Sequence, residues 1–395
     1  MLKRCLVLLA AIMLTVFSSS SAEYKSYLLT EGNWQTCFPL DAHNTVVSSR
    51  DWHEDSEPDP WYVCWYRDGV LYRELTGSIP EGDRTARLQV PRPALWDGER
   101  LSLYYCVRTK PLKTYQQGFW IPTPDPDCFE VHLAEWTEEG LENDRILPEA
   151  WFDTYDNDGC DARSALVYSG DRGRTALYNG QETLLPDSVP VNLAENILRV
   201  LPVAGDVCLV KVMDNGNGCA QVVCLDHGAE RYRVTLPENE MNPGRILLPE
   251  KRGGFFCIDG YRPARYEPEI LTHYGEDGRV DRTLALAGRN VVVHLLASAV
   301  SPGSGLCTLY GTAVANSRKV YTVFAMDLDE DLNVTRLDVR KIDPAYGDYS
   351  PVVMVAADGT PYVYIESYSG EYLYPVLIPF SKLKKSRQTY GLALR

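Results

Sequence analysis

Short apolar runs rich in β-branched residues alternate with turn-forming residues along most of the chain. The segment 197–237 shows this pattern most clearly. Its runs are Ile197–Val203, Val207–Met213, Cys219–Asp226 and Glu230–Leu236, of which the last is rich in charge. Short runs bounded by turn residues are typical of β-strands, and a helical period is confined to Asn192–Arg199. The pattern predicts an all-β chain built from units of four strands, with the fourth strand facing solvent.

The four-strand unit recurs along the chain, and a proline marks each recurrence. The markers are Pro39, Pro91, Pro148, Pro202, Pro249, Pro302 and Pro351. Three of them have an Arg lead-in, in Arg145-Ile-Leu-Pro148, Arg199-Val-Leu-Pro202 and Arg245-Ile-Leu-Leu-Pro249. A repeat of about 50 residues with strand content indicates a β-propeller. We expect a single domain over residues 23–395 with seven four-stranded blades. The alternatives are six blades with an irregular insertion after Pro148, and a β-sandwich joined to a smaller propeller.

A second regularity is an acidic turn, usually with glycine, before each expected outer strand. The turns are Arg67–Gly69, Glu138–Gly140, Asp171–Gly173, Asp226–Gly228, Glu276–Gly278 and Asp329–Asp331. Glycine supplies the positive φ that tight hairpins need. The last unit provides only Val352–Ala356, Tyr362–Ser367 and Tyr372–Phe380. We therefore expect Tyr24–Thr30 to supply its missing outer strand and to close the ring, which removes an open sheet edge.

Residues 1–22 have the form of a secretory signal peptide. Lys3 and Arg4 precede the apolar run Leu6–Phe17, and small residues follow at Ser20–Ala22. The apolar run is too short to favour a spanning helix, although an uncleaved anchor is the alternative. No later segment approaches membrane-spanning length. We therefore expect a secreted or cell-surface protein that has no membrane span after signal cleavage and is a monomer.

The chain is acidic, with a formal net charge of −15. Removal of the signal peptide, which carries two basic residues and no acid, would make it about −17. Such a surface repels phosphate backbones and anionic headgroups, so nucleic acid is a poor partner. The locally basic tail Lys382–Arg395 is expected to be a solvated end.

Ten of the 11 cysteines follow the expected cleavage point, which permits disulfides but does not specify them. If Met213 lies opposite Cys219 in a hairpin, Cys208 lies opposite Cys224. A cross-strand bridge and two buried free thiols are then both compatible with the sequence. The chain contains no Cys-x-x-Cys pair, which argues against a zinc ribbon.

No cofactor or metal is expected. Asp327–Asn333 and Thr154–Gly159 have alternating oxygen donors, as calcium loops do. However, Leu332 stands where such a loop needs glycine, and the second segment lacks the first acid. Both are interpreted as solvated turns, and the six histidines show no ligand spacing.

The segment Ser169-Gly-Asp171-Arg-Gly173-Arg-Thr175 resembles the Asp box of sialidases and related propellers. The match covers seven residues, and Ala176 stands where the family's following Trp is found. In that family the Asp and Thr side chains tie the turn to the backbone, so the resemblance implies propeller geometry. A sialidase would also need an arginine triad, a Tyr/Glu pair and several boxes.

The candidate binding face follows from strand order. In a four-stranded blade, the turns after the second strand and the links between blades emerge on one side, and here these connections are long. Long loops on a rigid scaffold, rich in Tyr, Trp and Arg, are a common place for recognition. The candidate ligand-binding residues are Trp52, His53, Tyr115, Trp120, Tyr261, Arg262, Arg265, Tyr346, Asp348 and Tyr349.

We therefore expect an exported β-propeller that binds a glycan or protein partner through these loops. The alternative is a propeller glycoside hydrolase, sialidase-like or other, with two carboxylates about 5–10 Å apart in the central funnel. A structural cell-surface role is a third possibility. Sequence does not identify catalytic residues among the 54 acids.

Overall fold

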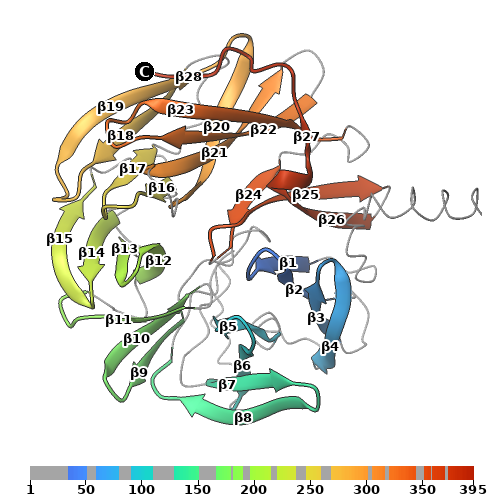
Figure 1. Ribbon diagram of the computed structural model, residues 1–395. Helices are drawn as coiled ribbons and strands as arrows, with labels where there is room; N and C mark the ends of the chain where they lie inside the picture. Colours follow the sequence, from blue (N-terminus) through green and yellow to red (C-terminus); the bar gives the residue numbers. More distant parts are fainter. Residues whose placement is uncertain are drawn as a thin grey trace, which may run out of the picture.

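The structure is a computed structural model. It describes residues 34–50, 59–79, 90–109, 129–150, 166–178, 181–189, 196–214, 220–236, 246–258, 268–300, 305–315, 320–343, 351–356, 358–369 and 372–395. These residues form seven antiparallel β-sheets arranged as the blades of a β-propeller (Figure 1). The predicted all-β fold and the seven-blade count are confirmed, and the six-blade and sandwich alternatives are wrong.

The blades are numbered in chain order. Blade 1 consists of β1 (Trp34–Pro39), β2 (Asn44–Arg50), β3 (Asp59–Arg67) and β4 (Val70–Ile79). Blade 2 consists of β5 (Arg92–Trp96), β6 (Leu101–Arg108), β7 (Phe129–Thr137) and β8 (Gly140–Leu147). Blade 3 has the described strands β9 (Leu166–Gly170), β10 (Gly173–Tyr178) and β11 (Gln181–Leu184). Blade 4 consists of β12 (Asn196–Ala204), β13 (Val207–Asp214), β14 (Ala220–Asp226) and β15 (Ala229–Thr235).

Blade 5 consists of β16 (Ile246–Pro249), β17 (Phe255–Ile258), β18 (Glu269–Tyr274) and β19 (Val280–Ala287), with β28 (Ala393–Leu394) added at its edge. Blade 6 consists of β20 (Val291–Ala299), β21 (Cys307–Ala315), β22 (Val320–Leu328) and β23 (Val334–Lys341), with β27 (Lys384–Lys385) at its edge. Blade 7 has the described strands β24 (Val352–Val355), β25 (Pro361–Ser369) and β26 (Tyr372–Pro379), followed by the 3-10 helix η3 (Phe380–Lys382).

The core is divided into seven apolar clusters, and each cluster joins two consecutive blades. A single blade is apolar on both faces, so it cannot bury itself alone and packs on a neighbour at each side. The seventh cluster joins the last blade to the first: Val47 and Cys64 of blade 1 pack with Tyr364 and Leu377 of blade 7. This cluster closes the ring with the described strands.

The first strands β1, β5, β12, β16 and β24 lie towards the middle of the ring, and the fourth strands β4, β8, β15 and β19 lie outside (Figure 1). The predicted closing strand Tyr24–Thr30 and the signal peptide lie outside the described residues, so both stay predictions. No helix of the described residues has the length and apolar character needed to cross a membrane.

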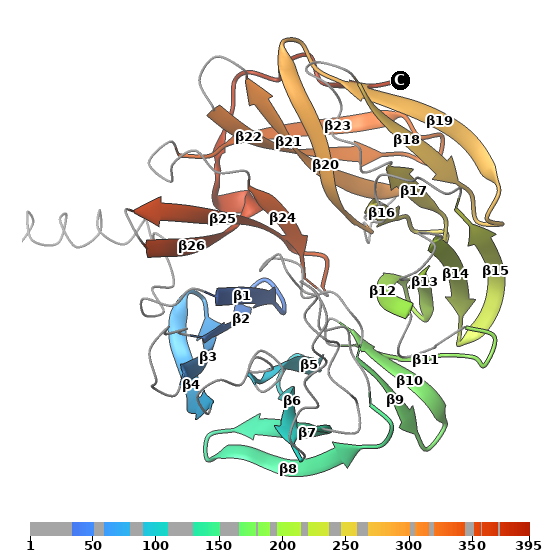
Figure 2. The ribbon, with the colours of Figure 1, turned by 180° about the vertical axis from the view of Figure 1, so that it is seen from behind.

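The expectation that Lys382–Arg395 is a solvated end is wrong. The segment leaves blade 7, runs along the outside of blade 6 and ends on blade 5 (Figures 1 and 2). β27 pairs with the end of β23, and β28 pairs with the end of β19. The segment's own Leu383 and Leu392 side chains are buried. Two hydrogen-bonded edges and two apolar anchors hold the segment in place, while its basic side chains stay exposed. We call residues 381–395 the strap.

The predicted register of the hairpin in blade 4 is wrong by one residue. Met213 pairs with Ala220, so Cys208 lies opposite Leu225 rather than Cys224. Because side chains alternate along a strand, the two thiols point to opposite faces of the sheet. Cys208 packs between blades 3 and 4, and Cys224 packs between blades 4 and 5. Both are free and buried, which confirms the alternative without a bridge.

The Arg lead-in is also not one repeated structural position. Arg199 and Pro202 lie on β12, the first strand of blade 4, but Arg145 lies on β8, the fourth strand of blade 2. Pro148 follows that outer strand. This marker is therefore displaced relative to the others.

Candidate binding site

An exposed apolar run opens β4, the outer strand of blade 1. Asp68 and Gly69 form the turn from β3 with φ of 50° and 78°, which is the conformation of a tight hairpin. Val70, Leu71 and Tyr72 follow with 69%, 48% and 39% of their surfaces exposed. The other large exposed apolar side chains of the described residues are isolated on separate strands: Val107, Ile146, Leu184, Ile270, Val280 and Val334.

Tyr72 is the extra residue of a β-bulge. Tyr66 pairs with Leu71, but Trp65 pairs with Arg73, so Tyr72 has no partner on β3. A bulge redirects a side chain relative to the regular alternation of a strand. The fourth strands of three other blades carry an extra residue at the same place, namely Arg231, Asp281 and Thr335. The bulge is therefore a feature of the fold, and blade 1 places an exposed tyrosine at it.

The Tyr72 ring contacts two guanidinium groups. Arg67 and Arg73 lie 4.1 Å and 4.8 Å from its centroid, and the ring packs edge-on against Trp65 at 5.1 Å. Arg73 also donates to the carbonyl oxygen of Trp136 at 2.6 Å and to the Tyr72 hydroxyl at 3.3 Å. Each cation–π contact is worth about 0.5–1 kcal/mol at such a site. The exposed tyrosine is thus fixed in place before any ligand arrives.

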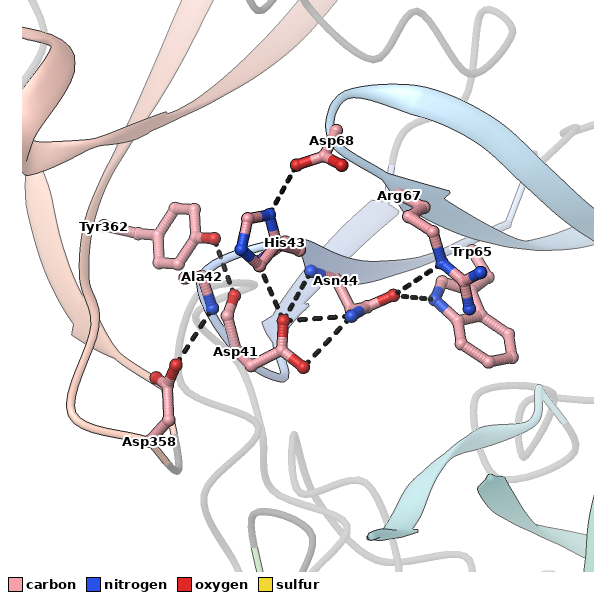
Figure 3. Close-up of polar contacts among 9 residues, drawn as sticks. All are labelled: Asp41, Ala42, His43, Asn44, Trp65, Arg67, Asp68, Asp358 and Tyr362. Atoms are coloured by element: carbon pink, nitrogen blue, oxygen red, sulfur yellow. Dashed lines mark hydrogen bonds and ion pairs between the residues drawn. The ribbon is translucent and has the colours of Figure 1, made fainter. Parts of the chain in front are cut away.

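A network of aromatic and polar side chains holds Trp65 and Arg67, the residues that contact Tyr72. Trp65 packs against Trp96 and Trp136 at centroid distances of 5.5 Å and 5.9 Å. Its indole N–H donates to Asn44 Oδ1 at 3.0 Å, and Arg67 Nε donates to the same oxygen at 3.4 Å (Figure 3). Asp41 in turn accepts two hydrogen bonds from the Asn44 amide nitrogen and one from the Trp96 indole.

The same network reaches the junction between blades 7 and 1. Tyr362 of blade 7 donates its hydroxyl to the Asp41 carbonyl oxygen at 2.7 Å, and the Ala42 N–H donates to Asp358 at 3.0 Å (Figure 3). His43 contacts Asp68 at 2.6 Å on the exposed side. That hydrogen bond and the charge of Asp68 raise the pKa of His43. The site is therefore anchored to the point where the ring closes.

A groove of about 580 Å³ lies between blades 1 and 2 beside Tyr72. One wall is residues 72–76 of β4, and the other is residues 136–140 of the β7–β8 hairpin. Glu74, Glu138 and Glu139 contribute carboxylates, whereas Arg73 is the one cation among the lining residues. The groove is therefore net acidic, with aromatic surface at one end. Such a concave site can hold a ligand through stacking and charge.

A second polar group lies at the opposite end of blade 2, next to the strand ends that flank residues 110–128. Tyr105 stacks on His132 at 5.2 Å, and His132 Nδ1 lies 3.0 Å from Asp144. Burial, followed by the charge of Asp144 and its hydrogen bond, raises the pKa of Tyr105 to about 12. His132 Nε2 is buried, and the nearest carboxylate, that of Glu130, is 3.8 Å away.

The predicted ligand-binding residues lie outside the described residues, so the structure does not place them. They are Trp52, His53, Tyr115, Trp120, Tyr261, Arg262, Arg265, Tyr346, Asp348 and Tyr349. The sequence did not predict the groove, because the candidate residues were taken from the long loops. The signal that could have found it is Val70-Leu71-Tyr72, three apolar residues in succession on a strand that should be polar.

The other motifs act as turns where they are described. In Asp327–Asn333, the Asp329 carboxylate accepts the N–H groups of Asp331 and Asn333, and these bonds lower its pKa. Thr154–Gly159 lies outside the described residues. Ser169–Thr175 joins β9 and β10, with Asp171 exposed and Thr175 donating to the Gly173 carbonyl oxygen. Among the described residues, no group of three or more His, Cys, Asp and Glu side chains could hold a metal ion.

Comparisons with known proteins give no family. No family model and no curated protein matches the chain. Among solved structures, the NanB sialidase of Streptococcus pneumoniae is 10% identical with a TM-score of 0.40, over 91% of this chain and 70% of the sialidase. Prolyl oligopeptidase B of Galerina marginata is 13% identical with a TM-score of 0.36, over 84% of this chain and 46% of the enzyme. A post-proline cleaving enzyme of Rickettsia typhi is 10% identical with a TM-score of 0.37, over 92% of this chain and 57% of the enzyme.

Likenesses of this size carry no argument about activity, and the chain spans about half the length of the two post-proline enzymes. The propeller fold rests on the seven sheets and the seven clusters described above.

Proposed function

We propose that this protein is an exported β-propeller binding module that recognises its partner at the groove between blades 1 and 2. The observation that carries this proposal is the exposed Tyr72 ring, which contacts Arg67 and Arg73 beside the groove. Tyr and Arg give large contact area, and a preorganised side chain loses little entropy on binding. The predicted loop residues belong to connections at the opposite ends of these strands and stay predictions.

A glycan array and a phage-displayed peptide library, both screened with the purified protein, test this function. Ligands found in either screen are measured again with Tyr72→Ala and with the matched control Ile146→Ala, an exposed apolar residue on β8. We expect Tyr72→Ala to weaken binding by about 10-fold or more, as a central aromatic contact does. Ile146→Ala should bind as the wild type does, and urea unfolding checks that both variants are folded.

The proposal fails if no ligand from either screen depends on Tyr72. It also fails if a panel of glycosides is hydrolysed by the wild type while both screens stay blank, since that result would favour the hydrolase alternative.

A further inference from the structure

The strap shows how the outer edge of a blade in this protein is occupied. β28 adds antiparallel to β19 through Leu394 and Ala393, and β27 adds antiparallel to β23 through Lys385 and Lys384. An edge strand presents unpaired N–H and C=O groups, so a short extended segment can add to it whatever its side chains are. The segment that does so here is basic: residues 381–395 carry Lys382, Lys384, Lys385, Arg387 and Arg395 and no acid.

β4 holds the same place in blade 1 that β19 and β23 hold in blades 5 and 6. It is the last strand in the order β1-β2-β3-β4, and within the described part of the chain no strand pairs with its outer side. Glu74, Thr76 and Ser78 are exposed along it, whereas Arg73, Leu75 and Gly77 are half-buried towards blade 2. The outer edge is therefore accessible over the length of strand that also forms one wall of the groove.

Two features distinguish β4 from the other outer edges. It opens with the one run of consecutive exposed apolar side chains among the described residues, Val70 to Tyr72. It also borders the acidic groove, in which the Glu138 side chain is 84% exposed and lies 3.9 Å from Arg73. Arg73 is already engaged by the Trp136 carbonyl oxygen and by the Tyr72 ring. Glu74 and Glu139 stay available to a cation from outside.

These observations select a partner by its chemistry. The unpaired edge can hydrogen-bond to an extended backbone, and the carboxylates can pair with Lys or Arg. Tyr72 can stack on an apolar or guanidinium group. An acidic peptide or a sulfated glycan would meet like charge. We propose that the groove receives an extended, basic segment of another protein, which adds to β4 as a fifth strand. This inference rests on the proposed function and names the partner class of the same site.

A synthetic peptide of residues 381–395 with a fluorescent label is the probe, because it is extended, basic and able to pair with an outer edge of this fold. Its binding to the full chain is measured by fluorescence anisotropy. We expect Glu138→Lys with Glu139→Lys to weaken binding by about 10-fold, since two favourable rim charges become unfavourable. The matched control Asp171→Lys with Glu330→Lys makes the same change in net charge on exposed turns of blades 3 and 6 and should bind as the wild type does.

Two further measurements separate strand addition from simple charge attraction. A peptide methylated at alternate backbone nitrogens keeps its charge but cannot pair with β4, so it should bind at least about 10-fold more weakly. Hydrogen exchange of the complex should show slower exchange in residues 73–78. The intact chain is also tested for concentration-dependent self-association. If it associates and the Glu138→Lys, Glu139→Lys double variant does not, the proposal is supported and the partner is a second copy of the chain.

The proposal is overturned if the methylated peptide binds equally well, if the groove variants bind the peptide as the control does, or if protection falls on β19 or β23 instead of β4. A Tyr72-dependent ligand that is a glycan or an acidic peptide would leave the binding function standing and refute only this choice of partner. Loss of both peptide binding and all Tyr72-dependent ligands would refute both.

Discussion

Glu269 is a carboxyl group buried between blades 5 and 6, where its Oε2 accepts the Leu295 N–H at 2.6 Å. Burial raises its pKa to about 7, and the hydrogen bond opposes this rise only in part. An acid with a raised pKa holds its proton in the folded chain after the unfolded chain has lost it. Glu269 therefore does not change the free energy of unfolding below about pH 4.5. It lowers this free energy progressively between about pH 4.5 and 7, and the full loss is reached above about pH 7.

We expect Glu269→Gln to remove this penalty, because the amide oxygen can still accept the Leu295 N–H. The variant should match the wild type near pH 4 and exceed its free energy of unfolding by about 2–3 kcal/mol at pH 8. Urea unfolding at pH 4, 6 and 8 measures the difference. Parallel pH profiles of the two proteins would contradict this account.

At the scale of elements, the strap converts a basic terminal segment into part of two sheets. Leu392 packs in the cluster between blades 5 and 6, and the Ala285 and Arg395 backbones exchange hydrogen bonds of 2.7 Å and 3.0 Å. The Ser386 N–H donates to the Val339 carbonyl oxygen at 2.7 Å. Three blades are thereby tied to one segment.

We expect Leu392→Ala to lower the free energy of unfolding by about 2–4 kcal/mol, because it removes a buried anchor and leaves a cavity. Arg387→Ala, an exposed change in the same segment, should have little effect. Urea unfolding compares the two, and limited proteolysis should cleave the strap faster in Leu392→Ala. Equal stability of the two variants would show that the strap is only loosely attached.

The elements themselves could be read from the sequence. The predicted strands of blade 7 lie within one or two residues of β24, β25 and β26, because apolar runs and turn residues mark strand bounds locally. Register could not be read, since one additional residue in the turn places Cys208 and Cys224 on opposite faces of the sheet rather than on the same face. The bulge at Tyr72 could not be read either, because it exists only in the pairing of two strands, whereas the apolar run Val70–Tyr72 is visible in the sequence.

At the scale of the whole molecule, closure of the ring depends on contacts between residues more than 300 positions apart in the sequence. The Tyr362 hydroxyl and the Asp358 carboxylate reach the β1–β2 turn, above the cluster that joins blades 7 and 1. Contacts of this separation are entropically costly to form and are made late unless the intervening blades are already in place. The polar junction therefore fixes the register of the first blade against the last.

We expect Tyr362→Phe to cost about 1–2 kcal/mol, because the Asp41 carbonyl oxygen loses its donor. Thr322→Val is the matched control, since it removes a buried hydroxyl that donates to Ala313 within blade 6. Hydrogen exchange should become faster in β1, β2, β24 and β25 in Tyr362→Phe and should stay unchanged there in Thr322→Val. Unchanged exchange at the junction in Tyr362→Phe would contradict this role.

Four blades share the bulge, whereas the side chain at its extra position differs in each of them. The kink is present whether the chain places Tyr72, Arg231, Asp281 or Thr335 there, so the backbone shape does not require one type of side chain. Proteins that descend from the same ancestor could acquire new preferences by exchanging four side chains on the rim. A library randomised at these positions would be a compact starting point for engineering new recognition.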